Sequence, residues 1–236
     1  MADVSGNELA ICELGTIEYR AALALQERMR DARAAGELPD LLLLLEHPPV
    51  YTRGRRSDPG ELPMGEDWYL AQGIDVADTD RGGKVTYHGP GQLVGYPIMA
   101  VPDVVAFVRT MERAVVAALE EAGIQARVRT EEGPDFTGVW VGERKIASIG
   151  IHVARGVSTH GFAINVENDL QPFEWIVPCG LEGVRMTSVI HERGDPGPGA
   201  MPAFRAIVAR CFATAFQRTP RNVRAEELPA AGVPSS

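Results

Sequence analysis

Three stretches of the chain repeat apolar residues at helical spacing, and we interpret each as an amphipathic helix. The first covers residues 17–35, where Thr16 is a candidate N-cap. The second covers residues 104–122 and follows Asp103, which also suits a cap, and the third covers residues 202–217. Each stretch is long enough for several turns with one continuous apolar face. We therefore expect three helices packed on a common core.

The other apolar segments are short, as is typical of β-strands. Residues 41–46, LLLLLE, are nearly all leucine, which predicts a strand buried on both faces. Residues 137–141, 145–153 and 159–166 are separated by turn sequences that contain glycine, which predicts an antiparallel meander. Helices combined with such strands predict an α+β or open α/β fold, a single domain with a mixed, largely antiparallel sheet flanked by helices.

Large apolar residues are concentrated between residues 9 and 217 of the 236-residue chain. This length suits one domain with a full hydrophobic core, so we expect a single domain over residues 9–217. Residues 1–8 and 218–236 lack clustered large apolar residues, and we expect both to be flexible tails.

The charge and cysteine content exclude several classes of protein. The chain has 23 Lys and Arg residues against 32 Asp and Glu residues, a formal net charge of −9. Nucleic acids and anionic membranes are bound by broad positive surfaces, so we expect neither as a partner. The N-terminus has no signal-peptide pattern, and no apolar run is long enough to cross a bilayer. The three cysteines are widely spaced without metal-site spacing, which favours a reducing, cytoplasmic location and no bound metal.

Cys179 is the candidate nucleophile, and Lys145 is its candidate partner. Cys179 lies in a Pro-Cys-Gly segment with little room for a helix or a strand. The pKa of a free thiol is about 8.5, and a nearby ammonium group raises the thiolate fraction at neutral pH. A thiol and a lysine without a phosphate-binding loop indicate acyl transfer through a thioester. Cys211, by contrast, lies on the apolar face of the third helix and is expected in the core.

The position of Lys145 at the start of an apolar strand predicts its surroundings. Counting by two along the strand places Lys145 on the same face as Ala147, Ile149, Ile151 and Val153. Partial burial there would suit the amine to proton transfer. The alternative is that Lys145 ends a hairpin in solvent, and the spacing alone favours this alternative.

Residues 81–92, RGGKVTYHGPGQ, are the densest polar stretch of the chain. They match neither a Walker loop nor the dinucleotide-binding pattern. Because glycines let a ligand approach the backbone, the stretch is either a ligand-binding loop or an ordinary hairpin that contains His88. Gly150 and Gly161 inside two neighbouring strands favour a narrow slot for a slim acyl chain. The remaining histidines are expected to be structural or solvated: His47, His152, His160 and His191.

Taken together, these motifs resemble the lipoyl(octanoyl) transferase family, the octanoyl-[acyl-carrier-protein]:protein N-octanoyltransferases. The segments that carry the resemblance are EHPPVYTRG at 46–54, RGGKVTYHGPGQ at 81–92, KIASIG at 145–150, THGFAINV at 159–166 and PCG at 178–180. The resemblance covers about residues 9–217. It implies the fold that lipoate-protein ligases and biotin protein ligases share in their catalytic domains.

The resemblance also implies roles for residues. Cys179 would form the acyl-thioester intermediate, and Lys145 would lower the pKa of its thiol. No cofactor is expected, because thioester exchange is near thermoneutral and needs no ATP. The acyl-binding positions that the resemblance assigns are Arg81, Gly82, Gly83, Lys84, Val85, Thr86, Tyr87, His88, Ser148, Ile149, Gly150, Gly161, Phe162 and Ala163.

The implied partners are large acidic proteins. Octanoyl-acyl carrier protein would be the donor, and the acceptors would be lipoyl domains of 2-oxoacid dehydrogenase complexes and the glycine cleavage H protein. We expect a monomer. An enzyme with a net charge of −9 repels such partners at long range, so Arg53, Arg55 and Arg56 are a candidate docking cluster. The alternative is that these arginines form a solvated loop.

Three other activities are compatible with the same residues. An ATP-dependent lipoate-protein ligase would share the fold but activate the free acid. A cysteine hydrolase would use Cys179 with His88 and transfer the acyl group to water. A non-catalytic acyl-binding protein would retain its ligand after Cys179 is replaced.

Overall fold

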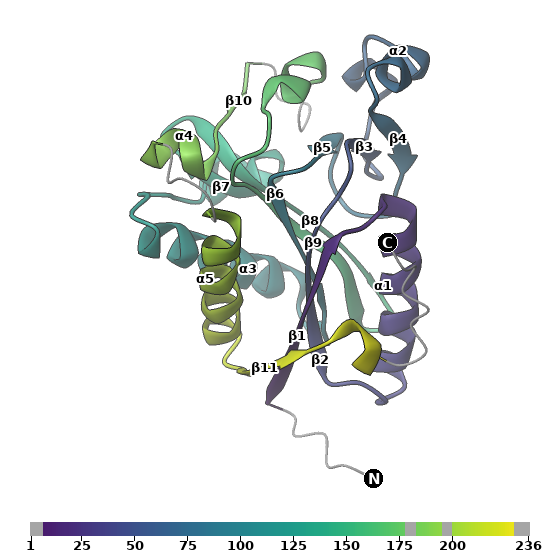
Figure 1. Cartoon of the computed structure of the whole chain (residues 1–236), viewed down its shortest axis with the longest axis vertical. Coiled ribbons are helices and arrows are strands. Elements are labelled where there is room, and N and C mark those ends of the chain that lie inside the picture. The colour runs from purple at the N-terminus through teal and green to yellow at the C-terminus, as the bar shows by residue number, and fades with distance from the viewer. Residues whose placement is uncertain (1–6, 178–182, 195–199, 229–236) are drawn as a thin grey trace.

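The computed structural model describes residues 7–177, 183–194 and 200–228. Within these residues the strands of the main sheet are β1 (Glu8–Thr16), β2 (Asp40–Glu46), β6 (Gln92–Ile98), β7 (Gly138–Val141), β8 (Arg144–Ala154), β9 (Val157–Asn165), β10 (Arg185–Met186) and β11 (Thr219–Val223). Their order is β10-β8-β9-β6-β2-β1-β11, and β7 also pairs with β8 (Figure 1). A smaller sheet has the order β4-β3-β5, with strands β3 (Val50–Arg53), β4 (Asp75–Asp78) and β5 (Thr86–His88).

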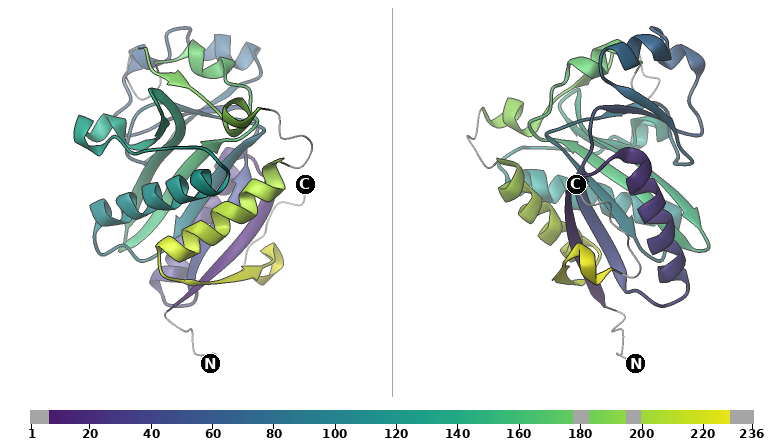
Figure 2. Two further views of the ribbon diagram at one scale, coloured as in Figure 1. Left: turned by 90° about the vertical axis from the view of Figure 1, so that its left-hand side faces the viewer. Right: turned by 45° about the vertical axis from the view of Figure 1, so that its right-hand side comes forward.

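Helices cover both faces of the main sheet. The α-helices are α1 (Tyr19–Ala34), α2 (Glu66–Ala71), α3 (Val104–Glu121), α4 (Val189–Arg193) and α5 (Ala200–Ala215). Short 3-10 turns are η1 (Pro59–Glu61), η2 (Thr130–Glu132), η3 (Pro134–Phe136), η4 (Gln171–Trp175) and η6 (Ala225–Glu227). Helices α3 and α5 lie side by side against one face, and α1 lies against the other (Figures 1 and 2). The predicted mixed sheet flanked by helices is therefore confirmed.

The leucine run occupies β2 in the middle of the main sheet, as predicted. Leu42 and Leu44 pack into the core beneath α3 and α5, whereas Leu41, Leu43 and Leu45 pack into the core beneath α1. All five side chains are at most 1% exposed. The absence of polar alternation therefore follows from burial on both faces.

The strand pairing is mixed, as expected. Strands β7, β8 and β9 form the predicted antiparallel meander, and β9, β6 and β2 continue it in antiparallel pairs. Strand β1 is parallel to both β2 and β11.

The helix starts are partly as predicted. Asp103 caps α3 by accepting hydrogen bonds from Val105 N (2.9 Å) and Ala106 N (3.0 Å). Thr16 does not cap α1, because β1 runs through it and pairs it with Glu46. Glu18 caps α1 instead, and its carboxylate accepts from Ala21 N at 2.9 Å.

The prediction that residues 218–236 form a flexible tail is wrong for the first part of this segment. Residues Thr219–Val223 form β11, which extends the sheet beside β1 from Glu8 to Cys12. Leu228, which follows η6, is 6% exposed and packs into the core beneath α1. This strand could not be predicted from the sequence, because most of its side chains face solvent and show no apolar alternation, and its pairing uses backbone groups.

No helix in the described part of the chain is both long and apolar enough to span a membrane.

Candidate active site

A β-bulge at Ile146 decides which way Lys145 faces. Val139 pairs with Ala147 and Trp140 pairs with Lys145, so Ile146 has no partner on β7. Successive residues of β7 point to opposite faces, and paired residues point to the same face. Lys145 and Ala147 therefore lie on opposite faces. The prediction that they share a face is wrong because the bulge adds one residue to β8.

The bulge brings Lys145 to the face of Ser148, where its side chain is 1% exposed. The solvent-exposed alternative for Lys145 is therefore wrong. Gly138 makes room for the side chain, since a Cβ at this position would lie 2.7 Å from Lys145 Cε. Lys145 Nζ lies 5.5 Å from the centre of the Trp140 ring, a cation–π arrangement. The amine is thus held at a defined place away from bulk water.

A buried carboxylate fixes the start of β7 beside this lysine. Glu112 of α3 is 1% exposed, and its Oε1 accepts a hydrogen bond from Gly138 N at 3.1 Å. Its Oε2 lies 2.6 Å from Arg109 Nη1, so the buried charge is paired. The position of Gly138, and with it the space for Lys145, is therefore set from α3.

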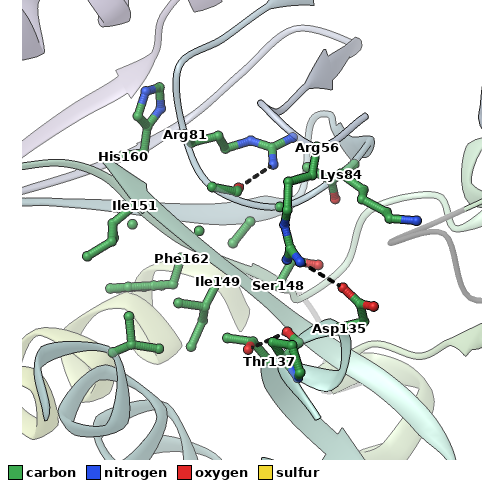
Figure 3. A pocket seen from close by; sticks show the side chains of 18 of the residues that line it. Arg56, Arg81, Lys84, Asp135, Thr137, Ser148, Ile149, Ile151, His160 and Phe162 are labelled. Atoms are coloured by element: carbon green, nitrogen blue, oxygen red, sulfur yellow. Dashed lines mark hydrogen bonds and ion pairs between the residues drawn. The ribbon is translucent and has the colours of Figure 1, made fainter. Parts of the chain in front are cut away.

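A cavity of about 350 Å³ lies beside the edge of β8 that faces away from β9. Pairing with β7 extends along β8 as far as Ser148, opposite Gly138 at the start of β7, and the glycine loop meets the same edge again where Gly82 N donates to Ile151 O at 2.9 Å. Between these two contacts no described residue pairs with this edge. Residues of both faces of β8 therefore line the cavity, and Figure 3 shows Ser148, Ile149 and Ile151 along it.

The glycine loop is fixed as a wall of this cavity by two buried anchors. Arg81 Nη2 donates to Thr52 O (2.6 Å) and Thr52 Oγ1 (2.8 Å) on β3. Glu61 of η1 accepts from Val85 N at 2.9 Å, and its carboxylate lies 3.4 Å from Lys84 Nζ. The stretch is therefore a cavity-lining loop rather than an ordinary solvent-exposed hairpin.

The two strand glycines, Gly150 and Gly161, allow neighbouring backbone segments to come into close contact. A Cβ at Gly161 would overlap Gly95 O of β6, and a Cβ at Gly150 would lie 2.8 Å from Gly82 O. Their missing side chains thus let β9 approach β6 and let the loop approach β8. These close approaches bring together the backbone segments that line the cavity.

Nearly all of the sequence-predicted binding residues meet at this cavity. Those that line it together with Lys145 are Arg81, Gly82, Gly83, Lys84, Val85, Thr86, His88, Ser148, Ile149, Gly150, Gly161, Phe162 and Ala163. Tyr87 does not line it; its ring packs beside Tyr51 and Phe173 in the core of the smaller sheet. Alternation along β5 explains this, because Tyr87 points opposite to its two neighbours. Cys179 lies outside the described residues.

Several residues that line the cavity were not predicted. Tyr19 at the start of α1, Tyr96 of β6 and His160 of β9 lie at one end of the cavity. Thr137 and Val104 also line it. His160 was expected to be structural or solvated; the solvated alternative is wrong, because the side chain is 1% exposed, with φ of +59°. His160 lies in the motif at 159–166, whereas no motif marks Tyr19 and Tyr96, which come from separate elements that meet it only in the fold.

Burial disfavours the charged form of the histidines at this cavity and of the neighbouring His47. Burial lowers the pKa of His88 well below its usual value, and the nearby His47 contributes in the same direction. Burial also lowers the pKa of His160, and it lowers that of His47 to about 4. His88 Nδ1 lies 2.7 Å from Gln92 Oε1, which holds the ring in the protein interior. This arrangement gives no support to a catalytic imidazolium at His88.

The candidate docking arginines do not form one positive patch. Arg53 pairs with Asp78 at 2.6 Å and also with Glu66. Arg56 lines the cavity and pairs with Asp135 at 3.2 Å (Figure 3). Arg53 and Arg56 therefore pair with different acidic residues, and of the two only Arg56 lines the cavity.

Comparison with known proteins identifies the family. Over residues 18–213 the chain matches the lipoyl protein ligase A/B catalytic domain. The chain belongs to this family. An octanoyltransferase of Solibacter usitatus is 51% identical over 174 residues, which cover 72% of this chain and 77% of that protein. An octanoyltransferase of Mycolicibacterium smegmatis is 47% identical over 209 residues, which cover 85% of this chain and 86% of that protein.

A solved structure of the family shows the same fold. The bipartite lipoate protein ligase of Thermoplasma acidophilum is 19% identical, with a TM-score of 0.69 over 94% of this chain and 88% of that chain. At this identity the similarity concerns the fold alone. The resemblance stated from the motifs is therefore confirmed for both the family and its fold.

Proposed function

We propose that this chain is an acyltransferase that moves an octanoyl group from a carrier-bound thioester to a lysine of a lipoyl domain, with Cys179 as the nucleophile and Lys145 as its partner. The octanoyltransferases that are 51% and 47% identical support octanoyl transfer in protein lipoylation. The structural observation that carries the proposal is the buried Lys145 at a cavity whose wall along β8 and β9 includes Ile149, Ile151 and Phe162. An acyl chain and a proton-transfer group would thus share one space.

The reaction has two acyl-transfer steps. In the first, the Cys179 thiolate attacks the donor carbonyl, a new C–S bond forms, and the donor C–S bond breaks as the carrier thiolate leaves and takes a proton from the Lys145 ammonium, which becomes neutral. In the second, the lysine amine of the lipoyl domain attacks the same carbonyl, a C–N bond forms, and the bond to Cys179 breaks. The proton lost by the incoming amine passes to Lys145 in its neutral form.

The chain on either side of Cys179 supports the pairing with Lys145. On the C-terminal side, Met186 of β10 pairs with Lys145, and Thr187 N donates to Lys145 O at 3.0 Å. On the N-terminal side, Val177 N donates to Glu61 O at 3.1 Å. The Glu61 carboxylate also holds the glycine loop. The segment that contains Cys179 is thus connected at both ends to walls of the cavity.

Lipoyl-domain proteins are the acceptors that the family indicates. As finer assignments we propose octanoyl-acyl carrier protein as the donor, and the 2-oxoacid dehydrogenase lipoyl domains and the glycine cleavage H protein as acceptors. We also propose that the enzyme acts as a monomer in the cytoplasm. These assignments agree with a two-step reaction in which two proteins visit the same cavity in turn.

Intact mass spectrometry tests the covalent step. The protein is mixed with octanoyl-acyl carrier protein without ATP, and wild type is compared with Cys179→Ser and with the control Cys211→Ser. We expect an octanoyl adduct on wild type and on Cys211→Ser, none on Cys179→Ser, and loss of the adduct when apo lipoyl domain is added. An equal adduct on Cys179→Ser, or acyl transfer only from free octanoate with ATP, would reject the proposal.

The docking role of the arginines is tested separately. Because Arg56 lines the cavity and Arg55 is its exposed neighbour, charge reversal of both should weaken attraction to an acidic carrier. We expect the double variant that carries both Arg55→Glu and Arg56→Glu to raise KM for octanoyl-acyl carrier protein about tenfold. We expect a smaller rise for octanoyl-pantetheine, and the exposed pair Arg155→Glu with Arg224→Glu serves as the control. Equal KM changes for the two donors would argue against docking.

A further inference from the structure

One end of the cavity is lined by hydrogen-bonding side chains rather than apolar ones. Along the β8–β9 ladder, Phe162 pairs with Ile149 and His160 pairs with Ile151, so the polar end lies farther along β8 from Lys145 than the pair of Ile149 and Phe162 does. Figure 3 shows His160 and Arg81 at this end. We call this end the polar floor; its members are each at most 8% exposed, and they are Tyr19, Arg81, His88, Tyr96 and His160.

Hydrogen bonds determine what Tyr96 offers to the cavity. His47 Nδ1 lies 2.7 Å from Ile17 O, a pure acceptor, so Nδ1 carries the proton. His47 is neutral, and its Nε2 therefore accepts from the Tyr96 hydroxyl at 2.7 Å. The Tyr96 proton is committed to His47, and its oxygen retains the capacity to accept a hydrogen bond from a ligand.

The same reasoning gives the protonation of His88. Gln92 Nε2 donates to Tyr87 O (3.0 Å) and to Asn165 Oδ1 (2.9 Å), so Gln92 Oε1 is the acceptor for His88 Nδ1 at 2.7 Å. Neutral His88 consequently has a bare lone pair on Nε2. No described residue donates a hydrogen bond to this nitrogen, although the side chain is 6% exposed and lines the cavity.

Tyr19 supplies a complementary donor. Its side chain is 2% exposed, and its ring stacks on that of His88 with centroids 6.0 Å apart. Thr79 is near enough to act on the pKa of this hydroxyl, but no described residue meets the geometry of a hydrogen bond with it. A buried hydroxyl in this condition needs a ligand atom or a water molecule as its partner.

We infer that the polar floor is a subsite for a hydrogen-bonding group at the far end of the acyl chain, so that a medium-chain acyl group with a terminal hydroxyl is a preferred ligand of the cavity. This inference deepens the proposed function and rests on it for the direction of the chain. A terminal hydroxyl donates to His88 Nε2 or Tyr96 Oη and accepts from Tyr19. An unsubstituted chain long enough to enter the floor displaces water from these groups without replacing its hydrogen bonds.

Two acids of equal length test the subsite. In 8-hydroxyoctanoic acid an oxygen replaces the terminal methyl group of nonanoic acid, so the two chains have the same number of heavy atoms. Their dissociation constants are measured by isothermal titration calorimetry with wild type, Tyr19→Phe and the control Tyr69→Phe. Tyr69 is a buried tyrosine outside the cavity whose hydroxyl donates to Trp175 O.

We expect wild type to bind the hydroxy acid about tenfold more tightly than nonanoic acid, the effect of roughly one well-formed hydrogen bond. Tyr19→Phe should reduce this ratio severalfold, and Tyr69→Phe should leave it unchanged; if Tyr19→Phe fails to fold, Tyr96→Phe replaces it. Equal or tighter binding of nonanoic acid, or binding of neither acid, overturns the inference. An octanoyl-transfer assay on the same preparation separates the two proposals, because active transfer with a ratio at or below one rejects the subsite alone.

Discussion

At the scale of single residues, the side chain of Lys145 is buried and is positioned by the residues packed around it. Its side chain lies between the empty Cβ position of Gly138 and the face of the Trp140 ring. Its main chain is tied to Met186 and Thr187, which follow the proposed nucleophile Cys179 in the sequence. The proposed mechanism therefore requires that Lys145 acts on the thiol of Cys179 and not on those of Cys12 and Cys211.

Thiol labelling tests this selectivity. Burial and three neighbouring glutamates raise the pKa of Cys12 to about 11, and burial raises that of Cys211, so both are protonated at neutral pH. We expect iodoacetamide at pH 7.5 to modify Cys179 at least tenfold faster than either. Lys145→Met should slow only the Cys179 reaction, as followed by peptide mass mapping. Equal labelling of Cys179 in wild type and variant would remove Lys145 from thiol activation.

Most individual site residues could be predicted because they lie in dense motifs. Lys145 and the glycine loop belong to short segments with specific patterns. Tyr19 and Tyr96, in contrast, lie in an α-helix and a strand outside the quoted motifs, and only the fold brings them together with His160 of the segment at 159–166. Their role depends on long-range packing, which local periodicity does not encode.

At the scale of elements, the decisive feature is the bulge between β7 and β8. Strict alternation cannot reveal it, because the unpaired Ile146 is apolar and buried like a regular core residue. The surrounding elements could be predicted, since α3 has a capping aspartate and the leucine run has no polar face. Strand β11 could not, because its side chains are mostly exposed.

Gly138→Ala tests the link between β7 and the lysine. Gly138 has φ of +136°, and a Cβ there would overlap Ala147 O and lie 2.7 Å from Lys145 Cε. We expect a loss of about 3 kcal/mol in the free energy of unfolding and at least a hundredfold loss of octanoyl transfer. Gly142→Ala is the matched control: its φ is +57° with open space around it, so it should cost about 1 kcal/mol and leave transfer intact. Equal transfer rates for the two variants would contradict this link.

Leu228→Ala tests the corrected C-terminus. Leu228 packs against the core beneath α1, so truncation should lower the free energy of unfolding by about 2–3 kcal/mol in urea titrations. Arg224→Ala, four residues earlier, changes a side chain that is 81% exposed and should have an effect below about 0.5 kcal/mol. Equal effects of the two changes would mean that this segment adds nothing to the core.

At the scale of the whole molecule, buried neutral histidines make stability depend on pH. The pKa of His47 is lowered to about 4, and the pKa values of His88 and His160 are also lowered, chiefly by burial. The unfolded chain binds these protons near pH 6.5, whereas the folded chain does not. The stability is therefore fully present above about pH 6.5 and is lost as the pH falls toward 4.

We expect the free energy of unfolding to be flat between pH 7 and 8 and to fall by about 2 kcal/mol from His47 alone at pH 5. Urea titrations across this range measure it. His47→Gln should flatten the slope, whereas His152→Gln, at a side chain that is 23% exposed, should not. A stability that is equal at pH 7 and pH 5 would show that these rings are protonated in the folded protein.

The bulge at Ile146 has a consequence for how such chains can vary. The amine reaches its place because β8 contributes one more residue than β7 between two fixed pairs, Val139 with Ala147 and Trp140 with Lys145. An insertion or deletion of one residue in this interval turns the lysine to the other face of the sheet, even if every motif remains recognisable. Relatives that keep the same chemistry should therefore align without gaps from Gly138 to Trp140 and from Lys145 to Ser148. A gap in either interval is a better sign of altered activity than any single substitution on the outer surface.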